Sequence, residues 1–263
     1  MGADSDKNKI ILARKRKTML RKWLSVLWIF LSFALFALII WGINFFYNSS
    51  YFKIKIIDIS GNSYYKDEEI LEKTSKFILN KNIFEIDTKK IESLLKSDFP
   101  RIKSAKIERV FPDNASILIE ERKPFVILEY NNEYFLLDDE NNIIEKITDN
   151  LSSYNSLLIM KSIINYMPAE GDKIGIKSII SAVNIYDLFD ETIKQVINCG
   201  SVMKNNTGDI YFETKDSKVI IYGTSKDIIK KNAVLLQILE DLKTEKINYS
   251  IIDLRITDNP IVK

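Results

Sequence analysis

Hydrophobic residues are concentrated in one continuous segment near the start of the chain. Residues 23–52 contain no acidic or basic side chain, and their apolar core, 23–47, precedes more than two hundred residues of mixed sequence. An α-helix rises about 1.5 Å per residue, so roughly 20 residues cross the hydrocarbon layer of a membrane. Trp23, Trp41 and Tyr47 lie near the ends of the core, where aromatic side chains favour the membrane interface. The pattern predicts a transmembrane helix over 23–47.

A cleaved signal peptide is the alternative interpretation of this segment. The hydrophobic region of a signal peptide is about 7–15 residues long and ends in a site of small residues. The run here is longer, and it ends in Phe45, Phe46 and Tyr47. A lipid-anchored form would need a cysteine near the segment, and none is there. The sequence therefore predicts a retained, single-pass anchor.

Basic residues precede the apolar segment and predict its orientation. Residues 1–22 hold eight Lys or Arg against two Asp, whereas 48–67 hold three Lys. The positive-inside rule then places the N-terminal tail in the cytoplasm and the bulk of the chain outside it. Binding of anionic lipid or of a cytoplasmic partner is the alternative role for these charges, and a topology signal is the simpler one. The signal comprises Arg14, Lys15, Arg16, Lys17, Arg21 and Lys22.

Composition narrows the chemistry available to the exterior. Beyond the basic tail the chain is slightly acidic, so its overall charge does not indicate nucleic-acid binding. It contains no histidine, which excludes histidine-based catalysis and the commonest zinc ligand. Its single cysteine, Cys199, cannot form an intramolecular disulfide, and its apolar neighbours predict a small buried residue. Because phosphate-binding and nucleophile motifs are also missing, the sequence predicts no enzyme activity and no cofactor.

Four acidic pairs are the remaining candidates for carboxylate chemistry. Two carboxylates can serve as acid and base on a glycan, but neighbouring residues of a strand point to opposite faces. The pairs also lack the spaced Asp/Asn pattern with glycine that a calcium loop needs. We interpret them as solvated surface. They are Glu68-Glu69, Glu120-Glu121, Asp138-Asp139 and Glu240-Asp241.

The segment directly after the apolar run predicts a β-α-α-β-β order, a mixed sheet with two helices on one face. Its second helix should begin at a cap formed by Asp87 or Thr88 and end before Pro100. Phe111-Pro112-Asp113-Asn114 has the composition of a turn between the last two strands. The predicted elements are a strand at 52–59, helices at 67–77 and 88–99, and strands at 102–110 and 116–120.

From Pro124 onward the pattern changes to short strands. A hairpin around Asn131-Asn132 should join 125–130 to 134–137, and a polar turn, 138–142, leads to 143–147. The spacing predicts further strands near 194–203, 208–214, 218–223 and 250–257. It predicts helices over 176–189 and 228–242, the second with an apolar face made by Ile228, Ile229, Val234, Leu235, Ile238, Leu239 and Leu242.

Several short motifs follow the apolar segment in a fixed order. In the first part they are Phe52-x-Ile54-x-x-Ile57-x-Ile59-x-Gly61-Asn62, Ile83-Phe84-x-Ile86-Asp87, Pro100-x-Ile102-x-x-Ala105-x-Ile107-x-Arg109, Phe111-Pro112 and Ile117-x-Ile119-x-Glu121-Arg122-x-Pro124. In the second part they are Tyr134-Phe135-Leu136-Leu137-Asp138, Gly223 and Ile252-Asp253-Leu254-Arg255. In residues, order and lengths, the chain resembles the FtsQ/DivIB family of bacterial cell-division proteins.

The resemblance implies an α+β protein with a POTRA domain next to the membrane. The expected parts are a cytoplasmic tail (1–22), a transmembrane helix (23–47), a POTRA-like domain (51–121) and a β-rich partner-binding domain (122–263). The chain departs from the family pattern at three places. Asn replaces glycine in the turn Asn80-Lys81-Asn82, so an Asn must adopt the left-handed conformation there. Ile256 stands where many members have an aromatic residue, and Pro260 should end ladder pairing.

The final strand, 250–257, is the candidate partner-binding site. At a sheet edge its unpaired N–H and C=O groups can be completed by a strand from another chain. The resemblance implies that the partners are the bitopic division proteins FtsL and FtsB (DivIC), with septal wall synthases and membrane lipid as further contacts. We carry this role to Ile252, Asp253, Arg255 and Ile256.

The resulting hypothesis is a non-enzymatic division scaffold located at the septum, which influences septal wall synthesis. A POTRA-containing transport or assembly factor would use the same strand addition, but usually carries tandem copies of the domain. A membrane-anchored wall hydrolase would need a convergent polar site that a histidine-free sequence does not indicate.

Overall fold

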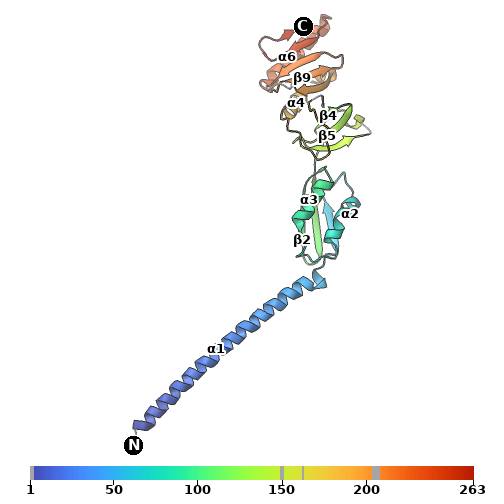
Figure 1. Ribbon diagram of the computed structural model, residues 1–263. Coiled ribbons are helices and arrows are strands. Elements are labelled where there is room, and N and C mark those ends of the chain that lie inside the picture. The colour runs from blue at the N-terminus through green and yellow to red at the C-terminus, as the bar shows by residue number, and fades with distance from the viewer. Residues whose placement is uncertain (1–2, 149–150, 162, 203–207) are drawn as a thin grey trace.

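The computed structural model describes residues 3–148, 151–161, 163–202 and 208–263, with side chains for Met19 and from Lys22 onward. The protein is extended: a long helix, a small α/β unit and a larger β-rich unit follow one another (Figure 1). This is the predicted α+β architecture.

Helix α1, Ala3–Asn48, contains the apolar segment. Among the described residues, its part Lys22–Asn48 is the one helical stretch that is long and apolar enough to cross a membrane. The side chains of the predicted topology residues Arg14, Lys15, Arg16, Lys17 and Arg21 lie outside the described part, and Lys22 is exposed.

The small unit has the predicted β-α-α-β-β order. Its sheet has the order β1-β3-β2, with β1 parallel and β2 antiparallel to the central β3. Both helices cover one face of this sheet (Figure 1). The elements are β1 (Ile56–Ser60), α2 (Asp67–Ile78), α3 (Thr88–Asp98), β2 (Ile102–Val110) and β3 (Asn114–Glu121).

Local sequence explains the boundaries of these elements. Asp87 caps α3, because its side chain accepts a hydrogen bond from Lys90 N at 3.1 Å. Asn80 has a φ of 60°, which confirms the predicted left-handed turn. The first strand begins later than predicted: Ser50–Phe52 form a single 3-10 turn, in which the Ser49 hydroxyl accepts from Tyr51 N. The strand pairing therefore starts at Ile56.

The large unit is built on a nine-stranded mixed sheet of order β12-β11-β10-β9-β8-β7-β4-β5-β6. Asn131 and Asn132, both with positive φ, form the predicted hairpin turn between β4 and β5. The strands are β4 (Val126–Tyr130), β5 (Glu133–Leu137), β6 (Ile143–Ile147), β7 (Ile159–Lys161), β8 (Ile197–Val202), β9 (Ile210–Thr214), β10 (Val219–Gly223), β11 (Ile251–Asp253) and β12 (Ile261–Val262). The helical elements are a 3-10 turn (Leu151–Tyr154), α4 (Ser178–Asp187), α5 (Glu191–Val196) and α6 (Ile228–Thr244).

The main hydrophobic core joins the strands to α4, α5 and α6. Helix α5 was not predicted. It ends at Val196, so the strand predicted near 194–203 begins only at Ile197. Cys199 is buried, as predicted, and burial raises the pKa of its thiol to about 12. A small second cluster, formed by Ile127, Leu136 and Ile144 with the 3-10 turn, packs separately.

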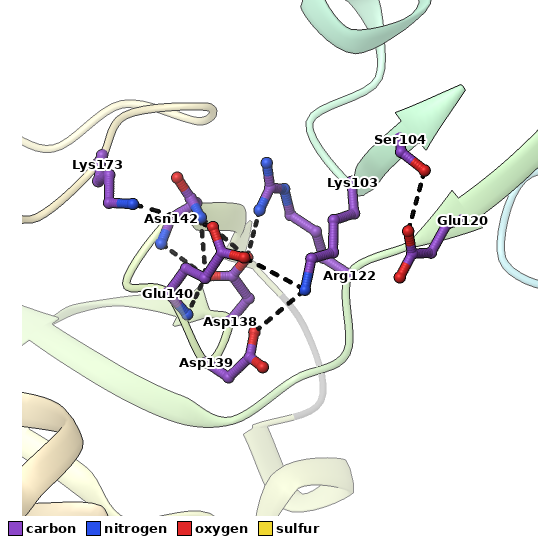
Figure 2. A network of polar contacts seen from close by, with 9 residues as sticks. All are labelled: Lys103, Ser104, Glu120, Arg122, Asp138, Asp139, Glu140, Asn142 and Lys173. Carbon is purple, nitrogen blue, oxygen red and sulfur yellow. Dashed lines mark hydrogen bonds and ion pairs between the residues drawn. The ribbon is translucent and has the colours of Figure 1, made fainter. Parts of the chain in front are cut away.

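Charged side chains join the two units (Figure 2). Arg122, which follows β3, pairs with Asp138 at the start of the turn before β6. Lys103 on β2 approaches Glu140 at 3.3 Å and Asp139 at 3.8 Å. Asp138 also accepts hydrogen bonds from the backbone N–H of Asn142 (2.7 Å) and of Glu140 (2.9 Å).

Two of the acidic pairs lie at this contact between the units, and one of them corrects the prediction that all four pairs are solvated. Asp138 is fully buried rather than solvated, because its carboxylate organises the 138–142 turn and receives Arg122. Glu121 accepts the backbone N–H groups of Ser63, Tyr64 and Tyr65 at 3.0–3.2 Å. Burial by itself would raise the pKa of each carboxyl, but these donors outweigh it and lower both pKa values.

A second polar contact lies beside the first. The Arg101 guanidinium donates to Glu145 Oε1 at 3.0 Å and lies 3.7 Å from the centre of the Tyr64 ring. The hydroxyls of Tyr64 and Tyr154 donate to the same Glu145 carboxylate at 3.0 and 3.1 Å. Together with Arg122–Asp138, these contacts hold the β-rich unit on the end of the small unit away from α1 (Figure 1).

Candidate partner-binding edge

The predicted terminal strand is shorter than expected and is not the edge of the sheet. β11 ends at Asp253, so Arg255 and Ile256 lie in the following loop. The prediction that Pro260 ends the ladder pairing is wrong. Instead Pro260 precedes β12, which adds antiparallel to β11 with the pairs Ile252↔Val262 and Asp253↔Ile261. The open edge is therefore β12, which the sequence pattern missed because its two residues are too few to show an alternation.

The four predicted contact residues separate into two groups. Ile252 is 0% exposed and packs with Ile220 in the main core, so its side chain is not on the binding surface. Leu254 is also buried, as predicted, and its N–H extends the ladder by donating to Ile221 O at 2.8 Å. Asp253, Arg255 and Ile256 face the opposite way or lie in the loop.

Asp253 and Arg255 form a single charged unit on the outer face. The Arg255 Nε donates to Asp253 Oδ1 at 3.0 Å, its Nη2 donates to Oδ2 at 2.6 Å, and its backbone N–H also reaches Oδ1 at 3.0 Å. These hydrogen bonds from Arg255 lower the pKa of Asp253. The bidentate contact fixes the guanidinium while half of the Arg255 side chain stays exposed.

Gly223 leaves room for this arrangement at the end of β10. Its φ is +77°, and a Cβ built on it would lie 3.0 Å from Arg255 Cγ. The stem of Arg255 therefore crosses the backbone of β10, and Asp253, Arg255, Ile256, Asn259 and Ile261 line a shallow hollow of about 320 Å³. A hollow lined by two isoleucines and a fixed guanidinium can accept an apolar side chain next to a carboxylate or a carbonyl.

Exposed aliphatic residues lie on the 254–260 loop, on β12 and on α6. Ile256 is 67% exposed, Ile261 46% and Val262 40%. Ile229, which the sequence pattern assigned to the buried face of α6, is 85% exposed. Lys230, the next residue of α6, forms an ion pair with Asp258 and so ties the helix to the 256–259 loop.

A buried lysine explains why the face of α6 differs from the prediction. Lys231 is 3% exposed, and its Nζ donates to Tyr222 O at 2.8 Å and to Thr224 O at 3.0 Å. Burial lowers the pKa of this amine. The residues buried on α6 are Lys231, Leu235, Leu239 and Leu242, a helical spacing in which Lys231 takes the first position. The spacing was visible in the sequence, but the charge of Lys231 concealed it.

The backbone of β12 is available on its outer side. Ile251 and Lys263 exchange two hydrogen bonds, Lys263 N to Ile251 O at 3.0 Å and Ile251 N to Lys263 O at 3.1 Å. In an antiparallel ladder such pairs alternate with pairs that point their groups away from the partner strand. The N–H and C=O of Val262 therefore point outward.

The opposite edge, β6, is covered. Ile143 N donates to Asp172 O at 2.8 Å, and Gly171 N donates to Ile143 O at 2.9 Å. Farther along the strand, Lys146 N donates to the Glu170 carboxylate at 3.1 Å. The 170–172 segment thus uses the groups that another strand would need.

Comparisons with known proteins identify relatives of this chain. Residues 52–122 match the family model "POTRA domain, FtsQ-type". Cell division protein DivIB of Clostridium acetobutylicum is 25% identical over 222 residues, which cover 80% of this chain and 82% of that protein. Cell division protein FtsQ of Syntrophotalea carbinolica is 27% identical over 218 residues, covering 82% of this chain and 75% of the relative. The chain thus contains an FtsQ-type POTRA domain and is similar over most of its length to the cell-division proteins DivIB and FtsQ.

The predicted resemblance to FtsQ/DivIB proteins and the predicted fold class are confirmed, and the likeness to these cell-division proteins supports a division-related role. Among solved structures, the major extracytoplasmic domain of DivIB from Geobacillus stearothermophilus matches 48% of this chain and 97% of that chain, with a TM-score of 0.30 and 9% sequence identity. With one helix able to span a membrane in its described part, the protein has the build of a single-pass membrane protein.

Proposed function

We propose that this protein is a non-enzymatic scaffold of the division machinery. Its basic tail, 1–22, lies in the cytoplasm, and its POTRA-like domain (51–121) and β-rich domain (122–263) lie outside the membrane at the septum. The β-rich domain binds FtsL- and FtsB (DivIC)-like bitopic proteins, and through them it influences septal wall synthesis. The positive-inside bias of the tail and the likeness to FtsQ and DivIB proteins support this arrangement.

The observation that carries the proposal is the open edge at β12. Val262 directs an unpaired N–H and C=O outward, and Ile256 and Ile261 expose apolar side chains beside it. A partner strand would gain backbone hydrogen bonds from β12 and side-chain selectivity from the hollow at Arg255. We assign the side-chain contacts to Asp253, Arg255, Ile256 and Ile261. Ile252, which the sequence also predicted as a contact, is left out because it is buried.

The two rival functions lack such a supporting observation. A transport or assembly factor would use tandem POTRA domains, and the described residues contain one β-α-α-β-β unit. A wall hydrolase would need a convergent polar site, such as two carboxylates for a reaction on a glycan. The most buried acid of the four pairs, Asp138, is instead committed to Arg122 and to the 138–142 turn.

The test compares two substitutions at one edge residue. Val262→Pro removes the outward N–H while keeping the extended backbone, because proline and the residue before it favour extended conformations. Val262→Ala keeps the N–H and shortens the side chain. We expect Val262→Pro to weaken binding of the co-expressed FtsL–FtsB pair by on the order of tenfold or more, which is the loss of about 1.4 kcal/mol of binding free energy. Val262→Ala should stay within about threefold of the original affinity, as interface residues outside hot spots do.

Affinity is measured with the full chain in detergent, and circular dichroism checks that both variants keep the fold. Equal affinity for Val262→Pro and the unmodified chain would exclude strand addition at β12. A loss in both variants would mean that the side chain of Val262, rather than the backbone, makes the contact.

A further inference from the structure

Six aromatic rings converge where α1 meets the small unit. We define this aromatic collar as Phe46, Tyr47, Tyr51, Phe52, Phe84 and Phe111. The rings come from four separate segments: the end of α1, the 3-10 turn Ser50–Phe52, the loop between α2 and α3, and the turn between β2 and β3. Phe84 is the central ring, with centroid distances of 5.6 Å to Phe52, 5.4 Å to Phe111 and 6.5 Å to Phe46.

The collar remains exposed although its rings pack against one another. Phe111 is 57% exposed and Tyr51 62%, while Phe84 and Tyr47 are also exposed. These rings are therefore not part of the domain core, which lies behind them and includes Ile54, Ile83 and Ile86. Exposed, contiguous aromatic surface of this kind marks an interaction site.

Hydrogen bonds fix the collar at the end of α1. The side-chain amide of Asn82 donates to both Phe46 O and Tyr47 O at 2.8 Å, so it satisfies two of the carbonyls that a helix leaves unpaired at its C-terminus. Asn82 is itself buried, and its Oδ1 accepts from Phe84 N at 3.0 Å. One residue thus joins the last turn of α1 to the loop that carries Phe84.

The position of α1 in a membrane then sets the depth of the collar. Tyr47 is the last residue of the apolar segment, and Lys22–Asn48 is the stretch able to span a bilayer. If α1 spans a membrane, the end of its apolar segment at Phe46 and Tyr47 lies at the headgroup boundary, which aromatic side chains favour. Phe84 lies within 6.1–6.5 Å of both rings, and Phe111 follows it at 5.4 Å.

The charges around the collar are compatible with lipid headgroups. Lys53 and Lys81 flank it and are exposed, Lys55 is paired with Asp113 at 2.9 Å, and Glu85 is the exposed acid next to Phe84. Amines at this level can reach headgroup phosphates while the rings occupy the boundary below them.

We propose that the base of the small unit is a lipid-contacting surface, in which Phe84 and Phe111 enter the interface of the bilayer beside the C-terminal end of α1. The membrane is thus a binding partner of the folded domain, in addition to the helix. This surface would hold the domain at one height and one rotation on the membrane. The inference needs α1 to span a membrane and is independent of any partner at β12.

The test measures the depth of single residues in a bilayer. A nitroxide is attached to Phe84→Cys and to Phe111→Cys in a Cys199→Ala background, and the full chain is placed alone in nanodiscs of phosphatidylethanolamine and phosphatidylglycerol. Leu118→Cys is the matched control, because Leu118 is a 51% exposed apolar residue of the same unit on β3. We expect the ratio of oxygen to nickel-chelate collisions to be raised at 84 and 111 relative to 118, since oxygen concentrates in lipid and the chelate in water.

Equal ratios at 84, 111 and 118 would overturn the proposal. It would also be overturned if the ratio at 84 and 111 rose only after FtsL- and FtsB-like partners were added, because the collar would then be a protein-binding surface. Circular dichroism verifies folding of each labelled protein, and the more exposed Phe111 position provides an answer if Phe84→Cys fails to fold.

Discussion

The two edges of the nine-stranded sheet are finished in opposite ways. At β6, the 170–172 segment pairs with Ile143, and Glu170 pairs with Lys146 N. At β12, Val262 directs its backbone groups outward, and the side chains beside it are aliphatic and exposed. Both strands belong to one sheet, so the contrast does not arise from a difference in fold.

The contrast indicates which edge is available for binding. Exposed edge strands promote unwanted pairing, and proteins usually cover them, shorten them or place charges on them. The β6 edge is covered by backbone, whereas β12 is protected by shortness alone, with Pro260 directly before it. An edge with an apolar border and a fixed Arg255 beside it is suited to a specific strand, because the border selects the sequence that can add.

The largest expected effect is on the free energy of unfolding, and it distinguishes a buried residue near the open edge from an exposed one. Ile252→Ala should destabilise the β-rich unit by about 2–5 kcal/mol, because it leaves a cavity where a fully buried side chain packed. Ile256→Ala, at a residue that is 67% exposed, should change the free energy of unfolding by less than about 0.5 kcal/mol. Denaturant unfolding of the full chain in detergent, followed by near-ultraviolet circular dichroism, measures both.

These paired variants decide whether the two residues have different roles. Similar free energies of unfolding for Ile252→Ala and Ile256→Ala would contradict the assignment of Ile252 to the core. In that case Ile252 would return to the set of candidate contact residues.

A smaller effect is expected at the closed edge, where Asp138 organises the turn before β6. Asp138→Asn keeps the shape of the side chain but removes the charge that faces Arg122 and the Asn142 donors. We expect a loss of about 1.5–3 kcal/mol near neutral pH, the range for hydrogen bonds to a charged group. Asn142→Ala is a useful companion variant, because it removes the side-chain donor and leaves the charge of Asp138 in place.

The effect of Asp138→Asn should depend on pH. Burial opposes ionisation of Asp138, yet its hydrogen bonds lower the folded-state pKa below the ordinary value of 3.8. A carboxyl with a lowered folded-state pKa contributes stability above its unfolded-state pKa and loses it as the pH falls through the folded-state value. The difference between the unmodified chain and Asp138→Asn should therefore shrink below about pH 4. A difference that stays constant down to pH 2 would show that the pKa of Asp138 is the same in the folded and the unfolded protein.

Much of the architecture was predictable from the sequence. The apolar run, the capping residue Asp87 and the left-handed Asn80 each follow from local chemistry, and each is found as predicted. The Asn131-Asn132 hairpin belongs to the same class, since its turn depends on two adjacent residues. Local signals predict elements whose structure is decided within a few residues.

The candidate site was predictable only in part, because it depends on contacts between distant segments. β12 is two residues long and exists through pairing with β11, so no periodic pattern could indicate it. Lys231 is buried because Tyr222 O and Thr224 O accept its hydrogen bonds, and Ile229 is exposed because α6 is rotated accordingly. The sequence predicts a surface position for Asp138 for the same reason: its partner Arg122 lies 16 residues away.

Substitutions of the side chains that line the hollow should change stability least. Their effect on binding affinity should nevertheless be clear. The double variant Arg255→Glu with Ile256→Asp replaces a fixed cation and an exposed aliphatic residue, and neither side chain is in the core. We expect unchanged circular dichroism and a melting temperature close to that of the unmodified chain. Affinity for the FtsL–FtsB pair should fall on the order of tenfold, as when contacts of an interface are replaced by repulsive charge. The control is the charge-reversed variant Glu170→Lys at the closed edge, which should leave affinity unchanged.

Because the backbone of β12 stays intact in the double variant, a full loss of binding there, combined with normal binding by Val262→Pro, would locate the affinity in the hollow instead of in the strand. Retained affinity in the double variant, combined with a loss in Val262→Pro, would mean that the edge supplies the affinity and the hollow contributes little to it.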